Sequence, residues 1–238
     1  MMQNQTFVKF RQKQDKAATI LKDLQRFVFV GKELGVNIDS SVHHKLDNVV
    51  DLIGTEGKLK VALIGGFSEG KTSIAAAWAE KYDKSTMNIS QEESSNAVNV
   101  YSIDDDIELI DTPGLFGFKE KYNNESGAIE KYKDITKKYI SEAHLVLYVM
   151  DSANPIKESH SDDLVWLFRT LNLLPRTIFV LSRFDEVADI EDEWDYYDNL
   201  KIKKQNVVSR LKDVITLTSK EEDLLQIVGV SANPFGMG

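Results

Sequence analysis

A glycine-rich octet between an apolar run and a helix-forming run constrains this chain more than any other feature. Residues 65–72 read GGFSEGKT and fit the phosphate-binding loop pattern G-x-x-x-x-G-K-[ST]. The preceding residues 61–64 are apolar, β-prone and bounded by glycine, which predicts a buried strand. Residues 74–79 predict a helix. Strand, glycine loop and helix are the context that the pattern requires, so an ordinary glycine turn is the weaker interpretation.

The residue types of this loop suit the phosphates of a nucleotide. Glycines at 65 and 70 leave room for backbone N–H groups to approach an anion and allow unusual φ values. The helix that follows directs its free N–H groups and its positive dipole end at the same anion. Lys71 can reach the β- and γ-phosphates, and the Thr72 hydroxyl is a hard oxygen ligand suited to Mg²⁺. The predicted phosphate-binding residues are Gly65, Gly66, Phe67, Ser68, Glu69, Gly70, Lys71, Thr72 and Ser73.

Charge and composition limit the remaining classes of function. The 238 residues carry a formal net charge of −9, of which residues 1–57 hold +1 and the remainder −10. This balance argues against a nucleic-acid partner for the main domain. The chain has no cysteine, so disulfides and thiolate zinc sites are excluded. Its start lacks the apolar core of a secretory signal, and no apolar run approaches the roughly 20 residues of a membrane helix. We therefore expect a cytoplasmic protein.

The first 57 residues predict a helical segment that is separate from the rest. Phe7, Phe10, Gln14, Ala17, Leu21, Leu24 and Val28 recur at steps of three and four residues, which places them on one helical stripe. A second helix is predicted over residues 41–53, followed by a linker at 54–57. These helices either pack on each other or on a missing partner, or they form a stalk or neck attached to the main domain.

From residue 58 onward, predicted strands and helices alternate. The predicted strands are 61–64, 97–102, 107–110, 144–150, 177–181 and 226–230, and the predicted helices after the loop helix are 125–140, 162–171 and 206–215. Such alternation indicates an α/β fold with a mainly parallel sheet flanked by helices. Ligands of these folds bind at the carboxyl ends of the strands. We assign residues 58–238 to this domain.

Three further motifs fall at such strand ends. Residues 111–114 read DTPG, residues 182–185 read SRFD, and residues 231–233 read SAN. Together with the octet they resemble the motifs of guanine-nucleotide-binding proteins of the P-loop class. The resemblance implies that Asp111 holds the Mg²⁺ shell and that the Gly114 amide senses the γ-phosphate. A carboxylate suits a hard cation, and a loop that contacts the last phosphate can collapse when that phosphate leaves.

The same resemblance assigns the base-reading residues. Asp185 would accept hydrogen bonds from the guanine N1 and N2 groups. Arg183 stands where lysine is usual, and Ser182 replaces the usual Asn or Thr. The loop Ser231, Ala232 and Asn233 lacks the usual lysine but works mostly through backbone amides. A proline turn for residues 111–114 and a surface Arg–Asp pair for 183 and 185 are the plain structural alternatives.

The loop GGFSEGKTS, in the form G-x-F-S-x-G-K-T-S, is similar to that of bacterial dynamin-like proteins of the dynamin superfamily. Preceding helices also fit that group, where they join later helices in a neck. The resemblance implies a GTPase that binds GTP with Mg²⁺, releases GDP, pairs with a second copy through its nucleotide face, and couples hydrolysis to membrane remodelling or vesicle-associated secretion. The membrane-binding parts and the final domain helix are expected in a longer protein, which would be peripheral to the membrane.

The catalytic groups are the least defined part of the site. Lys71 and Ser68 are candidates from the loop, and Ser94 or Ser95 would take the place of the switch I threonine on Mg²⁺. Leu115 and Phe67 occupy places where relatives carry polar groups that help to position water. Because phosphoryl transfer depends on positioning, we expect weak basal hydrolysis that a partner stimulates. The alternatives are a GTP-dependent assembly module with negligible hydrolysis and an adenine-nucleotide P-loop protein.

Overall fold

The computed structural model describes residues 3–36, 46–47, 58–79, 98–103, 107–112, 114, 137, 139–141 and 143–232. The chain divides into two units, Met1–Lys58 and Leu59–Gly238. In the described part of the chain, no helix is long and apolar enough to cross a membrane.

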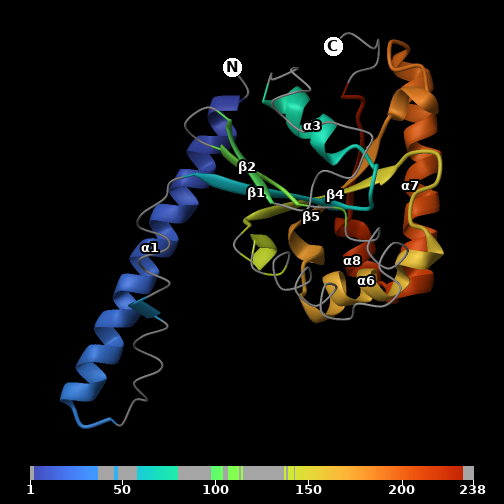
Figure 1. Ribbon diagram of the computed structural model, residues 1–238. Coiled ribbons are helices and arrows are strands. Elements are labelled where there is room, and N and C mark those ends of the chain that lie inside the picture. The colour runs from blue at the N-terminus through green and yellow to red at the C-terminus, as the bar shows by residue number, and fades with distance from the viewer. Residues whose placement is uncertain are drawn as a thin grey trace. The chain divides into compact units, whose positions relative to one another are not determined.

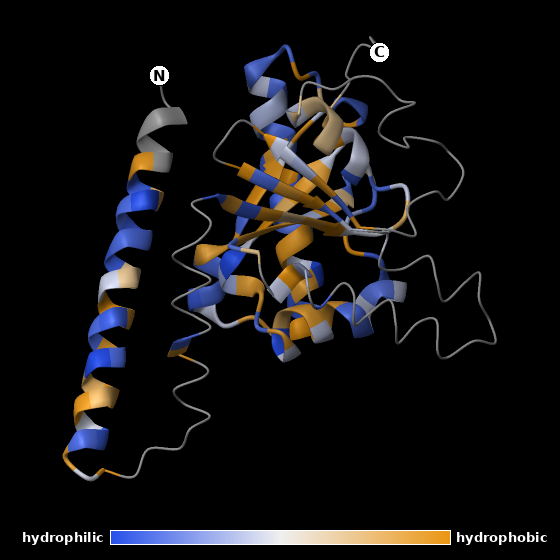
Figure 2. Ribbon diagram, turned by 60° about the vertical axis from the view of Figure 1, so that its left-hand side comes forward, coloured by the Kyte–Doolittle hydropathy of each residue, from blue (hydrophilic) through white to orange (hydrophobic). Residues whose placement is uncertain are grey.

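The first unit is built on one long helix, α1, over Gln3–Glu33. Hydrophilic residues predominate along this helix, with hydrophobic residues between them (Figure 2). The predicted stripe is confirmed over much of the helix, with Phe10, Gln14, Ala17 and Leu21 half-buried and Val28 buried.

Two observations refine the prediction for this unit. Leu24 departs from the stripe and is exposed. Residues 46–47 are helical, and Gln25 Nε2 donates a hydrogen bond to Asp47 Oδ1 at 2.7 Å. The rest of the helix predicted over 41–53 lies outside the described residues, as does Phe7 as a side chain.

The second unit is built on a six-stranded sheet with the order β2-β3-β1-β4-β5-β6. The strands are β1 (Leu59–Gly65), β2 (Asn99–Ile103), β3 (Ile107–Asp111), β4 (Leu145–Asp151), β5 (Thr177–Ser182) and β6 (Gln226–Gly229). Strand β2 pairs antiparallel with β3 at one edge, and every other pair is parallel. The predicted mainly parallel α/β fold is therefore confirmed, with strand ends shifted by one or two residues.

Strand β1 lies in the middle of the sheet between β3 and β4. Its residues Val61, Ala62, Leu63 and Ile64 have no exposed surface. Burial on both faces explains why this strand is a continuous apolar run instead of an alternating one. Figure 2 shows the same hydrophobic character along the centre of the sheet. The carboxyl end of β1 is thereby fixed at the centre of the domain.

Helices cover both faces of the sheet, as Figure 1 shows. Helix α3 (Lys71–Trp78) lies on one side, and α6 (Ser161–Val165) and α8 (Ser219–Leu224) lie on the other. The helix predicted over 162–171 is α6 continued by a π-helical turn, Trp166–Thr170. Of the helix predicted over 125–140, the structure describes only residues 137, 139 and 140, which are helical.

Helix α7 spans Glu193–Ile215 and is much longer than the predicted 206–215. Its N-terminal half is rich in acidic side chains, a pattern that is typical of a solvent-exposed face. Asp192 instead caps the helix, because its side chain accepts hydrogen bonds from the N–H groups of Trp194 and Asp195. Such a cap stabilises a helix by about 1 kcal/mol, and acidic residues also favour the first turn.

The main core lies between the sheet and the helices on the α6 side. Three aromatic rings meet there, with centroids 5.6 Å apart for Tyr148 and Phe168, 5.7 Å for Tyr148 and Phe179, and 5.3 Å for Phe168 and Phe179. All three side chains are fully buried. Tilted aromatic pairs of this kind contribute about 0.5–1.5 kcal/mol beyond their area burial. This core holds β4 and β5, and hence the two strand ends that flank the glycine loop.

Candidate nucleotide-binding site

The glycine loop connects β1 to α3, and its backbone requires glycine at two places. Gly65 has φ +152°, and a Cβ on it would overlap the carbonyl oxygen of Val149 on β4. Gly70 has φ +89° and lies at the N-terminus of α3. Ser68 also has a positive φ, of 56°. Positive φ values alternate with ordinary ones in such loops, which turns successive N–H groups toward one concave site. The predicted strand, loop and helix context is confirmed.

Lys71 begins α3 and is buried beneath the loop. Its ammonium donates hydrogen bonds to the carbonyl oxygens of Gly66 at 2.6 Å and Gly65 at 3.2 Å. Burial lowers the pKa of Lys71, while the nearby carboxylates of Asp111 and Glu69 act in the opposite direction. A charged amine held among carbonyl oxygens can transfer its hydrogen bonds to phosphate oxygens. This position fits the predicted role of Lys71.

Thr72 and Asp111 meet across the site. The Thr72 hydroxyl donates to Asp111 Oδ2 at 2.8 Å, and Asp111 Oδ1 is buried without a hydrogen-bond partner in the described part of the chain. Burial raises the pKa of Asp111, against the effects of the Thr72 hydrogen bond and the Lys71 charge. An unpartnered buried carboxylate oxygen is costly unless something binds it.

This pair of hard oxygen ligands fits Mg²⁺. The ion usually binds one or two protein oxygens, with waters and substrate phosphates completing its octahedron. Among the described residues, no group of three or more His, Cys, Asp or Glu side chains could hold a metal by itself. Thr72 and Asp111 would hold Mg²⁺ together with the phosphates of a nucleotide.

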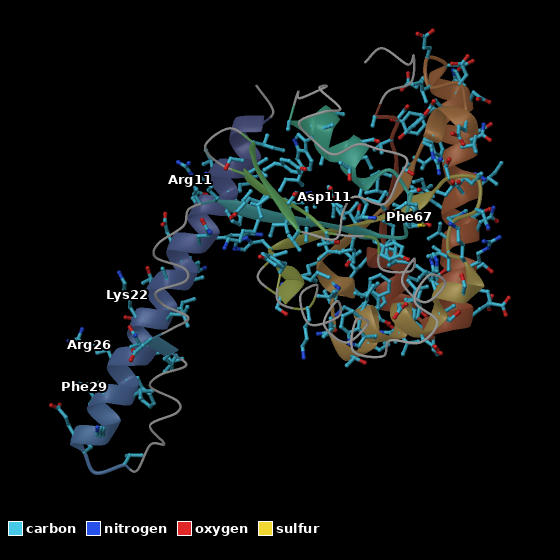
Figure 3. The ribbon with its side chains drawn as sticks, in the orientation of Figure 1. Arg11, Lys22, Arg26, Phe29, Phe67 and Asp111 are labelled. Atoms are coloured by element: carbon cyan, nitrogen blue, oxygen red, sulfur yellow. The ribbon has the colours of Figure 1, made fainter. Side chains whose placement is uncertain are left out.

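Gly114 packs directly against the glycine loop. A Cβ on Gly114 would lie 2.8 Å from both the Cα and the N atom of Phe67. Only glycine allows this approach without a shift of the backbone. The contact places Gly114 beside the loop, and its predicted role as a sensor of the terminal phosphate stays a prediction. Phe67 itself is 40% exposed at the tip of the loop (Figure 3).

The SRFD motif follows β5 and lies next to the glycine loop. Ser182 is buried and donates to the carbonyl oxygen of Met150 at 3.1 Å. A Cβ on Gly70 would lie 3.4 Å from Ser182 Cβ, so the two loops are in contact. Ser182 therefore joins β5 to β4 at the floor of the site.

Arg183 adopts a left-handed conformation with φ 50°. Its guanidinium forms an ion pair with Asp151 at the end of β4, and its Nε lies 3.8 Å from Glu186. Asp151 also accepts a hydrogen bond from the N–H of Ala153 at 2.7 Å. The side chain of Arg183 is thus held at the mouth of the site by Asp151, which the sequence analysis did not single out. The sequence signal that could have identified Asp151 was a carboxylate directly after a predicted strand.

Asp185 and the residues after β6 complete this side. Asp185 is exposed, and it has no hydrogen-bond or ion-pair partner in the described part of the chain. Val230 accepts a hydrogen bond from the N–H of Phe184 at 3.0 Å, so Ser231 and Ala232 begin beside the SRFD loop. The two predicted base-reading loops are therefore neighbours.

The remaining predicted site residues fall into three groups. Ser73 lies in the first turn of α3, and its predicted contact with phosphate stays a prediction. Ser94, Ser95, Leu115 and Asn233 lie outside the described residues. Glu69 was predicted to contact nucleotide, but its side chain is buried under the loop and pairs with Lys157. A contact of its backbone with phosphate stays a prediction.

Three features lie at the carboxyl edge of one mainly parallel sheet. They are a glycine loop with an ammonium beneath it, a carboxylate–hydroxyl pair suited to Mg²⁺, and the exposed carboxylate of Asp185. This arrangement defines the class: a P-loop GTPase domain.

Comparison with known proteins narrows this class. The model of the 50S ribosome-binding GTPase family matches residues 60–182, more than half of the chain. No curated protein sequence matches the chain. The solved structure of the LeoA bacterial dynamin GTPase from ETEC is 39% identical, with a TM-score of 0.72, and the match covers 98% of this chain and 40% of that one. The chain belongs to the 50S ribosome-binding GTPase family, and over nearly its whole length it is similar to a bacterial dynamin GTPase.

More distant structures share the fold alone. A dimerization-deficient mutant of Toc33 from Arabidopsis thaliana is 15% identical with a TM-score of 0.54, and the match covers 79% of this chain and 78% of that one. A structure of the chloroplast translocon components atToc33 and psToc159 is 16% identical with a TM-score of 0.53, covering 79% and 77% of the two chains. The present chain spans about two fifths of the length of LeoA.

Proposed function

We propose that this domain binds GTP with Mg²⁺ and hydrolyses it slowly. The observation that carries the proposal is the contact between Thr72 and Asp111 beside the buried Lys71, with one Asp111 oxygen left unpartnered. When Mg²⁺ is bound there, it would neutralise charge that develops on the phosphates. Lys71 would bind the phosphates, the Gly114 amide would contact the γ-phosphate, and Asp185 would accept hydrogen bonds from the base.

The slow rate follows from the side chains around the loop tip. Phe67 is partly exposed and apolar, so it offers no hydrogen bond to an attacking water. Ser68 is exposed beside it and is the candidate polar group of the loop. Hydrolysis requires a water in line with the leaving phosphate. A domain without a strong water-positioning group in its loop should turn over GTP slowly by itself.

Pairing of two nucleotide faces is the second part of the proposal. For the chloroplast components atToc33 and psToc159, dimerization is important for GTPase activity. Only the fold is shared with them, so pairing of the present domain rests on its exposed loop tip and on its likeness to LeoA, a bacterial dynamin GTPase. In the longer protein we propose that hydrolysis is coupled to membrane remodelling or vesicle-associated secretion at the membrane periphery.

Phosphate release at rising protein concentration tests the proposal. We expect the rate per molecule to rise with concentration, and the Lys71→Met protein to be inactive at every concentration. A rate per molecule that stays constant would contradict pairing. Concentration-dependent assembly with GTP but without phosphate release would instead establish a GTP-driven assembly module.

A further inference from the structure

A buried carboxylate inside the phosphate-binding loop needs an explanation, because it would repel the ligand. Glu69 is only 3% exposed and lies under the loop. An added Cβ on Gly66 would stand 2.7 Å from Glu69 Oε1, so the carboxylate packs against the loop backbone. Nucleotide phosphates carry several negative charges, and an unpaired carboxylate this close would weaken their binding.

One cation from another segment pairs with Glu69. Lys157 Nζ lies 2.9 Å from Glu69 Oε1, and the side chain of Lys157 is 38% exposed compared with 4% for that of Glu69. Lys157 comes from the segment that follows β4, 88 residues further along the chain. The exposed end of the pair therefore faces solvent, and the buried end belongs to the loop.

The segment that carries Lys157 is held in place by helix α7. Arg210 donates hydrogen bonds to the carbonyl oxygens of Pro155 at 2.6 Å and Ile156 at 3.2 Å, and to Asn154 Oδ1 at 2.8 Å. Ile156 is buried and has a positive φ of 55°. These contacts fix the backbone next to Lys157, so the ammonium is presented to Glu69 by a constrained segment.

Glu69 also acts on Lys71. The charge of Glu69 favours the protonated form of Lys71, as does the charge of Asp111. The charges of two carboxylates therefore act on Lys71. When phosphates and Mg²⁺ engage Lys71 and Asp111, Lys157 is the cation that remains paired with Glu69.

We propose that Lys157 is a positioning residue that neutralises Glu69 and so allows the loop to accept a triphosphate. Lys157 need not touch the nucleotide, because it acts through Glu69. The inference rests on the proposed function, since it assumes that the loop binds nucleotide phosphates. It adds a residue outside all four motifs to the determinants of affinity for GTP over GDP.

The test measures equilibrium binding of GTP and GDP with Mg²⁺ to five proteins. They are the wild type, Lys157→Met, Glu69→Gln, the double variant, and Lys201→Met on the exposed face of α7 as a matched control. Repulsion between the Glu69 carboxylate and the ligand grows with the charge of the ligand. Lys157→Met should therefore lower the affinity for GTP by about fivefold or more and the affinity for GDP by less. Added salt should reduce the loss. The double variant should recover GTP affinity, since Gln carries no charge.

Two results would overturn the inference. One is an equal loss of GTP and GDP affinity in Lys157→Met, which would indicate general damage to the loop. The other is a double variant that binds GTP as weakly as Lys157→Met does. A wild type that binds ATP as well as GTP would overturn only the guanine assignment, and the same comparison would then be made with ATP and ADP. A wild type that binds no nucleotide would overturn the proposed function and this inference together.

Discussion

Thr72 on α3 donates its hydroxyl to Asp111 at the end of β3 across 2.8 Å. This bond joins the glycine loop to the DTPG motif, although 39 residues separate them in sequence. Both oxygens stand where the β1 and β3 ends meet, because these strands are direct parallel neighbours in the sheet. The Mg²⁺ site we propose is therefore a product of sheet order.

Thr72→Ala should raise the Mg²⁺ concentration needed for GTP binding by about tenfold, because one oxygen ligand is lost. Thr72→Ser keeps the hydroxyl and should stay close to the wild type. A Mg²⁺ titration of GTP binding measures the effect. An unchanged midpoint for Thr72→Ala would remove this residue from the metal site.

Gly114→Ala should lower GTP affinity more than GDP affinity. The added Cβ would lie 2.8 Å from the Phe67 backbone, so the loop or the Gly114 segment must shift. The amide that we assign to the γ-phosphate would then be displaced, while contacts to the other phosphates remain. Paired GTP and GDP titrations measure the ratio. Equal affinities in variant and wild type would show that this close approach has no role in sensing.

Asp185→Asn should lower the affinity for GTP by about tenfold or more and raise the affinity for xanthosine triphosphate. The carboxylate accepts hydrogen bonds from guanine, and charged hydrogen bonds contribute about 1.5–3 kcal/mol each. An amide at this position can donate to the oxygen that xanthine carries in place of the amino group. Asp213→Asn, on the exposed face of α7, is the control. Loss of both nucleotides alike would indicate misfolding and not base selection.

The buried side chain of His160 should make the free energy of unfolding sensitive to acid. The side chain is buried, and burial lowers its pKa to about 4 from 6.5, with the charge of Lys157 adding to the effect. A histidine whose pKa is lowered on folding stabilises the fold above pH 6.5 and loses that contribution as pH falls through about 4. The loss is at most about 3 kcal/mol. Urea unfolding of the wild type and of His160→Gln across this range should show a flatter profile for the variant.

The sequence predicts the central part of this structure well for a physical reason. Strand β1 is an unbroken apolar run because both of its faces are buried, and the glycine loop needs its residue types locally. The positions of Asp111 and Asp185 follow from one rule, that the carboxyl ends of parallel strands share an edge. Local patterns and a single topological rule therefore suffice for most of the site.

What the sequence did not predict depends on contacts between distant segments. The pairing of Glu69 with Lys157 and of Arg183 with Asp151 needs the fold, because loops after β4 must reach those after β1 and β5. The early start of α7 was missed because Asp192 is a cap within an acidic stretch that resembles solvated surface. The antiparallel direction of β2 also lacks a signal in its short sequence.

The most direct test of this account is a competition experiment with the purified domain and Mg²⁺. A fluorescent guanine nucleotide is bound first, and unlabelled GTP or ATP is added. We predict that GTP displaces the label at concentrations at least about 100-fold lower than ATP does, as expected when a site donates or accepts hydrogen bonds that the wrong base cannot match. Equal displacement by ATP, or failure of the domain to hold guanine nucleotide while Lys71 and Asp111 are intact, would contradict it.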